Sequence, residues 1–200
     1  LVPNLDQRSR DYGNIAYSYR PGHADYTFDQ KYGFRDYRGG GRSSGRETIG
    51  RVAAGAIASK ILEDLGIQFL TYTKSIGPVS IQTMDPDEIP NNPFYMPDAQ
   101  AAKEAGEYLE QCMANHDSAG GIIECRINGV PAGLGDPVFG KLDAVLAQAV
   151  MSIGAVKAVE IGEGIGAASL NGSTDNDGFL SKDGEVIKTS NHAGGIMGGI

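Results

Sequence analysis

The chain has 200 residues and a formal net charge of −8 at pH 7, with 40% hydrophobic and 21% charged residues. These values are typical of a globular protein that builds its own core. The acidic balance argues against nucleic acid as a partner, and no apolar run reaches the length of a membrane span.

Charge is shared unevenly along the chain. Residues 1–60 hold ten basic and six acidic side chains, whereas residues 61–200 hold seven and nineteen. Residues 31–51 alone carry six basic side chains against two acids. A basic patch on an acidic protein concentrates anions locally, so it predicts an anionic small-molecule ligand. The six are Lys31, Arg35, Arg38, Arg42, Arg46 and Arg51.

Residues 1–38 are polar and rich in tyrosine, and they lack helical periodicity. We therefore expect loops and short extended pieces there. The segment Arg20-Pro21-Gly22 is a turn signal directly before His23. A histidine in a loop is commonly a surface residue, but this one lies close in sequence to the basic patch. His23 is therefore a candidate for proton transfer near neutral pH.

The glycine-rich stretch 39–48 (GGGRSSGRET) leads into the next helix. Ser44 and Glu47 have the spacing of a capping box, with Ser44 as the N-cap. A glycine-rich loop before a helix N-terminus suits a phosphate, although many capped helices bind nothing. A P-loop is excluded, because Arg46 replaces its lysine and Glu47 its serine or threonine.

The periodicity then predicts a helix over residues 46–65. The β-branched and aromatic residues 67–83, interrupted at Gly77-Pro78, predict two strands or one bent strand. Four prolines predict a loop over 85–97. A second helix is expected from 98 to 113, with Asp98 as its N-cap.

The remaining elements alternate in the same way. We expect a strand over 121–128, a helix over 139–153 and a strand over 155–161. Three helix-then-strand units predict an α/β or α+β fold with helices against a sheet, and leave open whether the strands are parallel.

Two further stretches allow other interpretations. Residues 162–167 (GEGIGA) suggest an NAD-type fingerprint, but its last glycine is missing and residues 168–178 resemble a loop rather than a helix. Residues 190–199 (SNHAGGIMGG) form either a ligand-facing loop or a mobile tail. Cys112 and Cys125 lack disulfide or CxxC spacing, which favours reduced thiols and a cytoplasmic protein.

Several of these stretches together resemble the chorismate synthase family. They follow the family's order over nearly the whole chain, and the set is highly specific. They are Arg20–Thr27 (RPGHADYT), Gly39–Ala56 (GGGRSSGRETIGRVAAGA), Gly129–Gly135 (GVPAGLG), Val156-Lys157 with Val159–Gly162, and Ser190–Gly199.

The resemblance implies an α+β fold of helices layered with antiparallel sheets. It also implies a single domain over residues 1–200, incomplete at both ends. The family eliminates phosphate and a ring hydrogen, in anti geometry, from enolpyruvylshikimate phosphate to make chorismate, a step of aromatic amino-acid biosynthesis. Reduced FMN is required, with NADPH as reductant in some members, and the enzymes are homotetramers. The alternative is a flavin- or phosphate-binding fragment without catalysis.

The resemblance also assigns roles to residues, and it assigns no metal site. His23 resembles the catalytic histidine that protonates reduced flavin. Contacts to FMN are implied for Arg42, Ser43, Ser44, Gly154, Ala155 and Gly198, and contacts to substrate for Arg20, Ser44 and Arg46. Gly45 stands where alanine is usual. Gly154 stands where asparagine is frequent, so only its backbone can contact the cofactor.

Parts of the family pattern have no counterpart in the sequence. These are the N-terminal GESHG segment with a second histidine, a loop with lysine and serine, and acidic and arginine residues toward the C-terminus. If these 200 residues were the entire molecule, we would expect little or no turnover.

Overall fold

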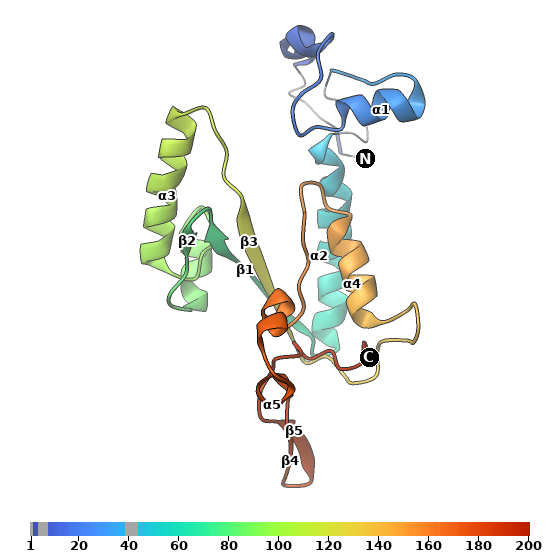
Figure 1. Cartoon of the computed structure of the whole chain (residues 1–200), viewed down its shortest axis with the longest axis vertical. Coiled ribbons are helices and arrows are strands. Elements are labelled where there is room, and N and C mark those ends of the chain that lie inside the picture. Colours follow the sequence, from blue (N-terminus) through green and yellow to red (C-terminus); the bar gives the residue numbers. More distant parts are fainter. Residues whose placement is uncertain (1, 4–7, 39–43) are drawn as a thin grey trace. The chain divides into compact units, whose positions relative to one another are not determined.

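The computed structural model describes residues 2–3, 8–38 and 44–200. The chain divides into two compact units, Leu1–Ile57 with Ala132–Ile200, and Ala58–Pro131. Figure 1 shows the elements along the chain. The expectation of a single domain stays a prediction.

The first unit is mainly helical. It also contains a small antiparallel hairpin, β4–β5. Its elements are the 3-10 helix η1 (Ser9–Ile15), α1 (Asp25–Tyr32), η3 (Gly45–Thr48), the start of α2 (Ile49–Asp64), α4 (Leu142–Met151), η5 (Gly164–Ser169), α5 (Gly172–Asp175), β4 (Phe179–Lys182) and β5 (Glu185–Lys188).

The helix predicted over 46–65 forms as η3 followed by α2. Ser44 is its N-cap, as predicted, and its hydroxyl accepts a hydrogen bond from the Arg46 backbone N–H at 3.3 Å. The predicted capping box is not completed among the described residues, because the Glu47 carboxylate forms an ion pair with Arg51, one turn further along the helix. This start signal is local, so the sequence was sufficient to locate it.

The expectation of loops before residue 38 was wrong for two segments, η1 and α1. The hydrophobic pattern of the sequence does not reveal helix α1, because the helix is stabilised by polar contacts and has no apolar face. Its single buried residue is Asp25, which pairs with arginines from outside the helix. The turn predicted before His23 is confirmed, since the His23 N–H bonds to the Arg20 carbonyl at 3.2 Å.

The second unit contains a three-stranded antiparallel sheet with order β2-β1-β3. The predicted strands 67–83 and 121–128 are confirmed, and the break at Gly77-Pro78 separates β1 from β2. The register pairs Tyr72 with Glu124 and contains an irregularity between Thr73 and Ser75. The elements are β1 (Gln68–Ile76), β2 (Val79–Ser80), η4 (Pro86–Asn91), α3 (Ala99–Ala114) and β3 (Gly121–Asn128).

Helix α3 covers the core of this unit. The face of the helix that carries alanines packs against a buried methionine. Four partly buried apolar side chains pack against this cluster, namely Ile76, Val79, Ile81 and Phe94. The buried cluster consists of Met96, Ala101, Ala102 and Ala105. The helix begins at the predicted N-cap Asp98. Residues 85–97 were predicted to be a loop because they contain four prolines. They include the short 3-10 helix η4, which that criterion did not predict.

The third predicted strand, 155–161, does not form. No regular element is assigned to these residues, although the helix before them is present as α4. An apolar, β-branched segment becomes a strand only when another strand pairs with its N–H and C=O groups. Among the described residues, no strand pairs with this segment.

Among the residues that the structure describes, no helix combines the length and apolarity needed to cross a bilayer.

Candidate functional site

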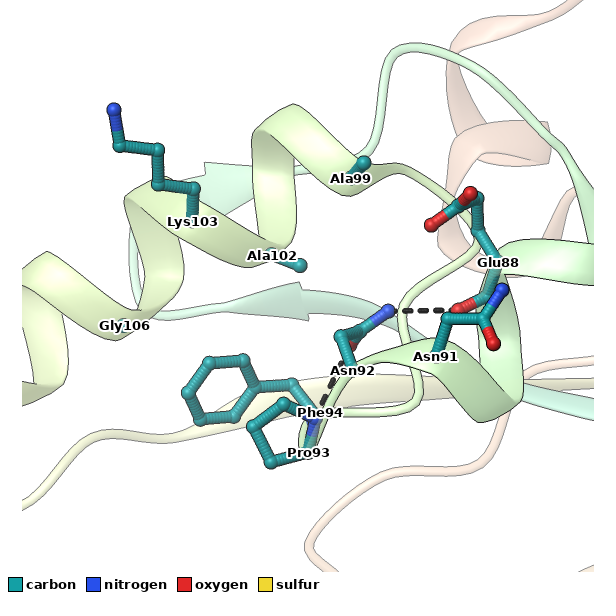
Figure 2. A pocket seen from close by; sticks show the side chains of 9 residues that line it. All are labelled: Glu88, Asn91, Asn92, Pro93, Phe94, Ala99, Ala102, Lys103 and Gly106. Carbon is teal, nitrogen blue, oxygen red and sulfur yellow. Dashed lines mark hydrogen bonds between the residues drawn. The ribbon is translucent and has the colours of Figure 1, made fainter.

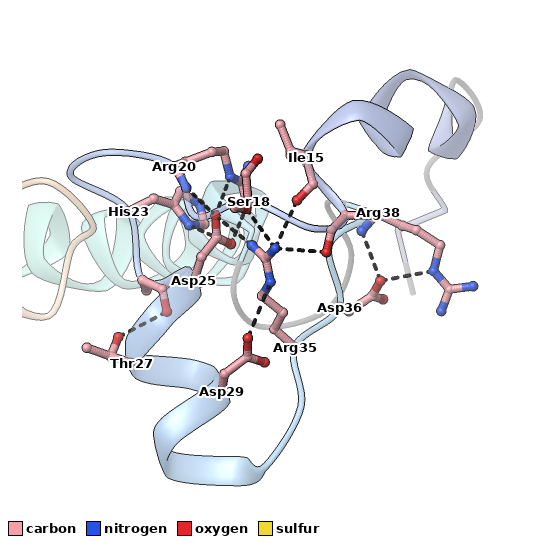
Figure 3. A network of polar contacts seen from close by, with 12 residues as sticks. Ile15, Ser18, Arg20, His23, Asp25, Thr27, Asp29, Arg35, Asp36 and Arg38 are labelled. Atoms are coloured by element: carbon pink, nitrogen blue, oxygen red, sulfur yellow. Dashed lines mark hydrogen bonds and ion pairs between the residues drawn. The ribbon is translucent and has the colours of Figure 1, made fainter.

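The predicted catalytic histidine lies in a polar cluster between the Arg20 turn and α1. Figure 3 shows Arg20, His23 and Arg35 arranged around the carboxylate of Asp25. Asp25 is 4% exposed, and the His23 side chain is 34% exposed. A buried carboxylate therefore lies directly behind an accessible imidazole.

Arg20 binds Asp25 through both its backbone and its side chain. Its Nε and one terminal nitrogen donate to the two carboxylate oxygens at 2.8 Å each, and its backbone N–H donates at 3.0 Å. His23 Nδ1 lies 3.1 Å from the same carboxylate. Two predicted site residues, Arg20 and His23, thus meet at one acid that the sequence analysis had not selected.

Arg35 holds the other side of Asp25. A terminal nitrogen lies 2.9 Å from the Asp25 carboxylate, and the other donates to the carbonyls of Ile15, Ala16 and Ser18 at 2.7–3.1 Å. The Arg35 side chain is 8% exposed. This arginine of the basic patch is a structural anchor and not an accessible anion ligand.

These contacts set the ionisation of the acid. The hydrogen bonds from the Arg20 side chain hold the pKa of Asp25 well below its ordinary range, outweighing the effect of burial. The same pairing raises the pKa of Arg20. Asp25 is therefore a carboxylate, and only an acceptor, at neutral pH.

The second group of predicted residues lies at the start of α2. Ser44 is half-buried as the N-cap, and Arg46 is exposed. Arg42 and Ser43 lie outside the described residues. A hydroxyl, a guanidinium and the N–H groups of a helix N-terminus suit an anionic group chemically.

The backbone positions predicted to contact FMN lie near the two ends of α4. Gly154 and Ala155 follow its C-terminus, whereas the Gly199 carbonyl, next to Gly198, accepts a hydrogen bond from the Leu142 N–H at its N-terminus. The ten residues of α4 separate these points by about 15 Å at 1.5 Å per residue. The structure thus does not place them at a single point.

A second polar cluster organises the loop 190–194, and its central residue, Asp177, was not predicted from the sequence. Asp177 accepts hydrogen bonds from the Ser190 hydroxyl at 2.6 Å and from the backbone N–H groups of His192 and Ala193 at 2.7 and 3.1 Å. The bond from Ser190 is the main reason that the pKa of Asp177 falls to about 2. The sequence did contain a signal for this cluster. Asp177 lies just before the hairpin β4–β5, and the Asp183-Gly184 dipeptide of that hairpin is typical of a two-residue turn.

The glycine pattern 162–167 has a structural explanation. Gly162 has φ +60°, and a Cβ there would lie 2.0 Å from the His192 carbonyl oxygen. The next residue, Glu163, donates its N–H to that oxygen at 2.8 Å, and its carboxylate lies 2.9 Å from His192 Nδ1. Gly162 thus allows two loops of this chain to cross, which removes the reason to infer a dinucleotide site.

A hollow of about 370 Å³ lies on the second unit, beside α3 and η4 (Figure 2). Asn92 shapes it by donating to the carbonyls of Glu88 and Met96 and accepting from the N–H groups of Phe94 and Met96. The described residues around it include none of the predicted site residues. Within the described ranges, no group of three or more His, Cys, Asp or Glu side chains could hold a metal ion.

Comparison with known proteins gives one consistent family. The family model of chorismate synthase matches residues 1–200. The chain is 62% identical to a chorismate synthase of Agathobacter rectalis over 202 residues, and 61% identical to one of Lachnoclostridium phytofermentans over 203 residues. Each match covers 100% of this chain and 55% of the relative, so the chain spans about half the length of these proteins.

A solved crystal structure of a chorismate synthase agrees with these matches. It superposes with a TM-score of 0.82 at 32% identity, covering 88% of this chain and 58% of that one. The expected α+β fold of helices and antiparallel sheets is thereby confirmed. The chain belongs to the chorismate synthase family.

Proposed function

We propose that this chain is part of a lyase that converts 5-enolpyruvylshikimate 3-phosphate to chorismate and phosphate by anti elimination, with reduced FMN. The observation that carries the proposal is the convergence of His23 and Arg20 on one buried carboxylate, in a chain of this family. The shikimate pathway and aromatic amino-acid biosynthesis follow from that reaction.

Arginine supplies what the leaving phosphate requires. Of the five N–H donors of a guanidinium, Asp25 occupies two in Arg20. Among the described residues no other hydrogen bond of this side chain is found, so three donors remain for an anion. Arg46, exposed at the start of α2, provides a second cation. Such donors bind phosphate in paired geometry and stabilise the negative charge that develops as the C–O bond breaks.

The described residues also fit a flavin mononucleotide. Ser44 offers a hydroxyl at a helix N-terminus, and no atom lies within 4 Å of where a Cβ of Gly154 or Gly198 would stand. Among the described residues, no side chain therefore blocks a ligand from the backbone at either glycine, and each is a separate point of approach. Reduced FMN, when bound, supplies the electron chemistry of the elimination and is not consumed.

His23 is the proton-carrying group of this arrangement. Its Nδ1 contacts Asp25, so its Nε2 is the atom that can hold or deliver a proton toward the ligands. A homotetramer, a cytoplasmic location and NADPH as the reductant of the flavin belong to the same proposal and are supported by the family resemblance.

An anaerobic titration with reduced FMN, with and without the substrate phosphate, tests this proposal. We expect flavin binding that tightens when substrate is present. Flavin binding that ignores substrate would instead indicate a binding fragment without catalysis. Dependence on a nicotinamide without flavin would indicate an oxidoreductase. A turnover assay, with the full-length Agathobacter rectalis relative as positive control, measures how much activity these 200 residues retain.

Two substitutions separate the roles of the site residues. In the full-length Agathobacter rectalis relative, replacing the histidine that aligns with His23 by alanine (His23→Ala in the present numbering) should lower turnover by about 100-fold or more, with little effect on substrate affinity, because proton transfer acts in the transition state. Arg46→Ala should weaken substrate binding by about tenfold or more. Lys60→Ala, at an exposed position of α2, is the matched control. Unchanged kinetics in either variant would contradict that residue's role.

A further inference from the structure

Asp25 is the one buried carboxylate of the site cluster to which no role has been assigned. Its oxygens face three cationic or proton-carrying side chains, those of Arg20, His23 and Arg35. A purely structural acid in the first turn of α1 would need only to satisfy the nearby backbone and one arginine. This one also contacts two residues with proposed roles in the reaction, His23 and Arg20.

The first consequence concerns the tautomer of His23. A carboxylate has no proton to donate, so its negative charge stabilises a hydrogen on the nitrogen that faces it. Because Nδ1 lies 3.1 Å from the Asp25 carboxylate, this contact favours the Nδ1–H tautomer of the neutral imidazole. Its Nε2 then presents a lone pair, or a proton when the ring is charged, on the accessible side.

The second consequence concerns the orientation of Arg20. Its Nε and one terminal nitrogen are fixed by the two carboxylate oxygens at 2.8 Å each. A planar guanidinium held along one edge can rotate little, so its opposite edge keeps one direction. That edge carries the donors left for an anion.

Arg35 prevents the acid from moving. Its terminal nitrogens connect Asp25 to the carbonyls of Ile15, Ala16 and Ser18, and its guanidinium lies 5.0 Å from the ring of Tyr19. Asp25 is therefore fixed from behind while its other contacts point to His23 and Arg20.

We propose that Asp25 is a positioning residue, which holds His23 in the Nδ1–H tautomer and fixes Arg20 with one edge available for the substrate phosphate. The inference rests on the proposed function for its catalytic meaning. The tautomer of His23 can be measured by itself, in an experiment that does not require enzymatic turnover.

The test is long-range ¹H–¹⁵N NMR of the imidazoles of the ¹⁵N-labelled chain at about pH 9, above the ordinary histidine pKa. His23→Gln identifies its signals among those of His116 and His192. The wild-type protein should show a protonated Nδ1 and an unprotonated Nε2 at His23. A predominant Nε2–H tautomer in the wild type would overturn the proposal without any variant.

Asp25→Asn retains the size of the side chain and removes its charge. We expect a mixture of the two His23 tautomers in this variant, and far-UV circular dichroism establishes that it is folded. Asp29→Asn is the control, because Asp29 lies on the same helix and faces Arg35 at 3.6 Å. It should leave the tautomer as in the wild type. An Asp25→Asn protein that is folded and retains the wild-type tautomer would refute the positioning role.

Kinetics then separates positioning from simple folding. In the turnover assay of the full-length relative, the aspartate that aligns with Asp25 should be changed to asparagine. A positioning role predicts a fall in kcat of at least tenfold per folded molecule, together with a higher KM because Arg20 is no longer fixed. A structural role predicts less folded protein with unchanged kcat and KM. If reduced FMN and substrate fail to bind, the proposed function fails, whereas the tautomer result is unaffected.

Discussion

The guanidinium of Arg51 donates hydrogen bonds to both the carbonyl oxygen and the hydroxyl of Ser152, at 2.9 and 3.2 Å. This contact joins residues 101 positions apart in the sequence. It connects the first turn of α2, which follows Ser44 and Arg46, to the end of α4, which precedes Gly154 and Ala155. One side chain therefore bridges the helix that follows Ser44 and the turn that precedes Gly154 and Ala155.

Replacing Arg51 should consequently disturb cofactor binding more than stability. For Arg51→Gln we expect reduced FMN to bind about tenfold more weakly, since a charge-assisted contact is lost. The stability should fall by less than about 1 kcal/mol because the side chain is 38% exposed. Anaerobic flavin titration and urea denaturation measure the two effects. Lys60→Gln is the control, and equal FMN affinity in the two variants would exclude this linking role.

Asp98 supports both the start of α3 and the chain after β2. Its carboxylate accepts hydrogen bonds from the N–H groups of Gln100 and Ala101, and from those of Gln82 and Thr83, at 2.9–3.1 Å. Asp98→Ala should lower the free energy of unfolding by about 2–4 kcal/mol, because a helix cap and two further bonds are lost. Urea denaturation measures this change. Asp87→Ala, at an exposed position, should change stability by less than about 0.5 kcal/mol.

Glu124 should make the stability of the sheet depend on pH in the acidic range. Burial raises its pKa, but hydrogen bonds from Lys74, Tyr72 and Arg126 outweigh this and lower the pKa to about 2 from its ordinary 4.5. A depressed carboxyl pKa contributes stability that is complete above about pH 4.5 and is lost as the pH falls toward about 2.

Glu124→Gln should therefore be less stable than the wild type by about 1–3 kcal/mol at pH 7, and the difference should shrink between about pH 4.5 and 2. Thermal denaturation followed by circular dichroism across this range tests it. Glu110→Gln, on the exposed side of α3, should follow the wild-type curve. A difference between Glu124→Gln and wild type that does not depend on pH would be evidence against the ion cluster.

Gly162 lies where two loops of the first unit cross in close contact. For Gly162→Ala we expect a loss of more than about 2 kcal/mol, because the new Cβ meets the His192 carbonyl and the φ of +60° disfavours alanine. Gly55→Ala is a matched control in α2, where no atom lies within 4 Å of the added Cβ. It should gain up to about 1 kcal/mol. Similar denaturation midpoints for the two variants would show that the loops do not cross as described.

The sequence by itself determined those features whose signals are local. Ser44 and Asp98 cap their helices through N–H groups two or three residues away, and the strands at 68–76 and 121–128 carry their own β-branched and aromatic pattern. The resemblance of the motifs likewise identified the family, because family motifs are written in consecutive residues.

Only the tertiary structure decided features that require a distant partner. Segment 155–161 has a strand-like composition but no strand beside it, while α1 has no apolar face and is fixed by arginines before and after it. The meeting of Arg20, His23 and Arg35 at Asp25 is of the same kind. Hydrogen bonds and ion pairs act over about 3 Å in space, whatever the separation in sequence, and residue spacing alone does not record which groups meet.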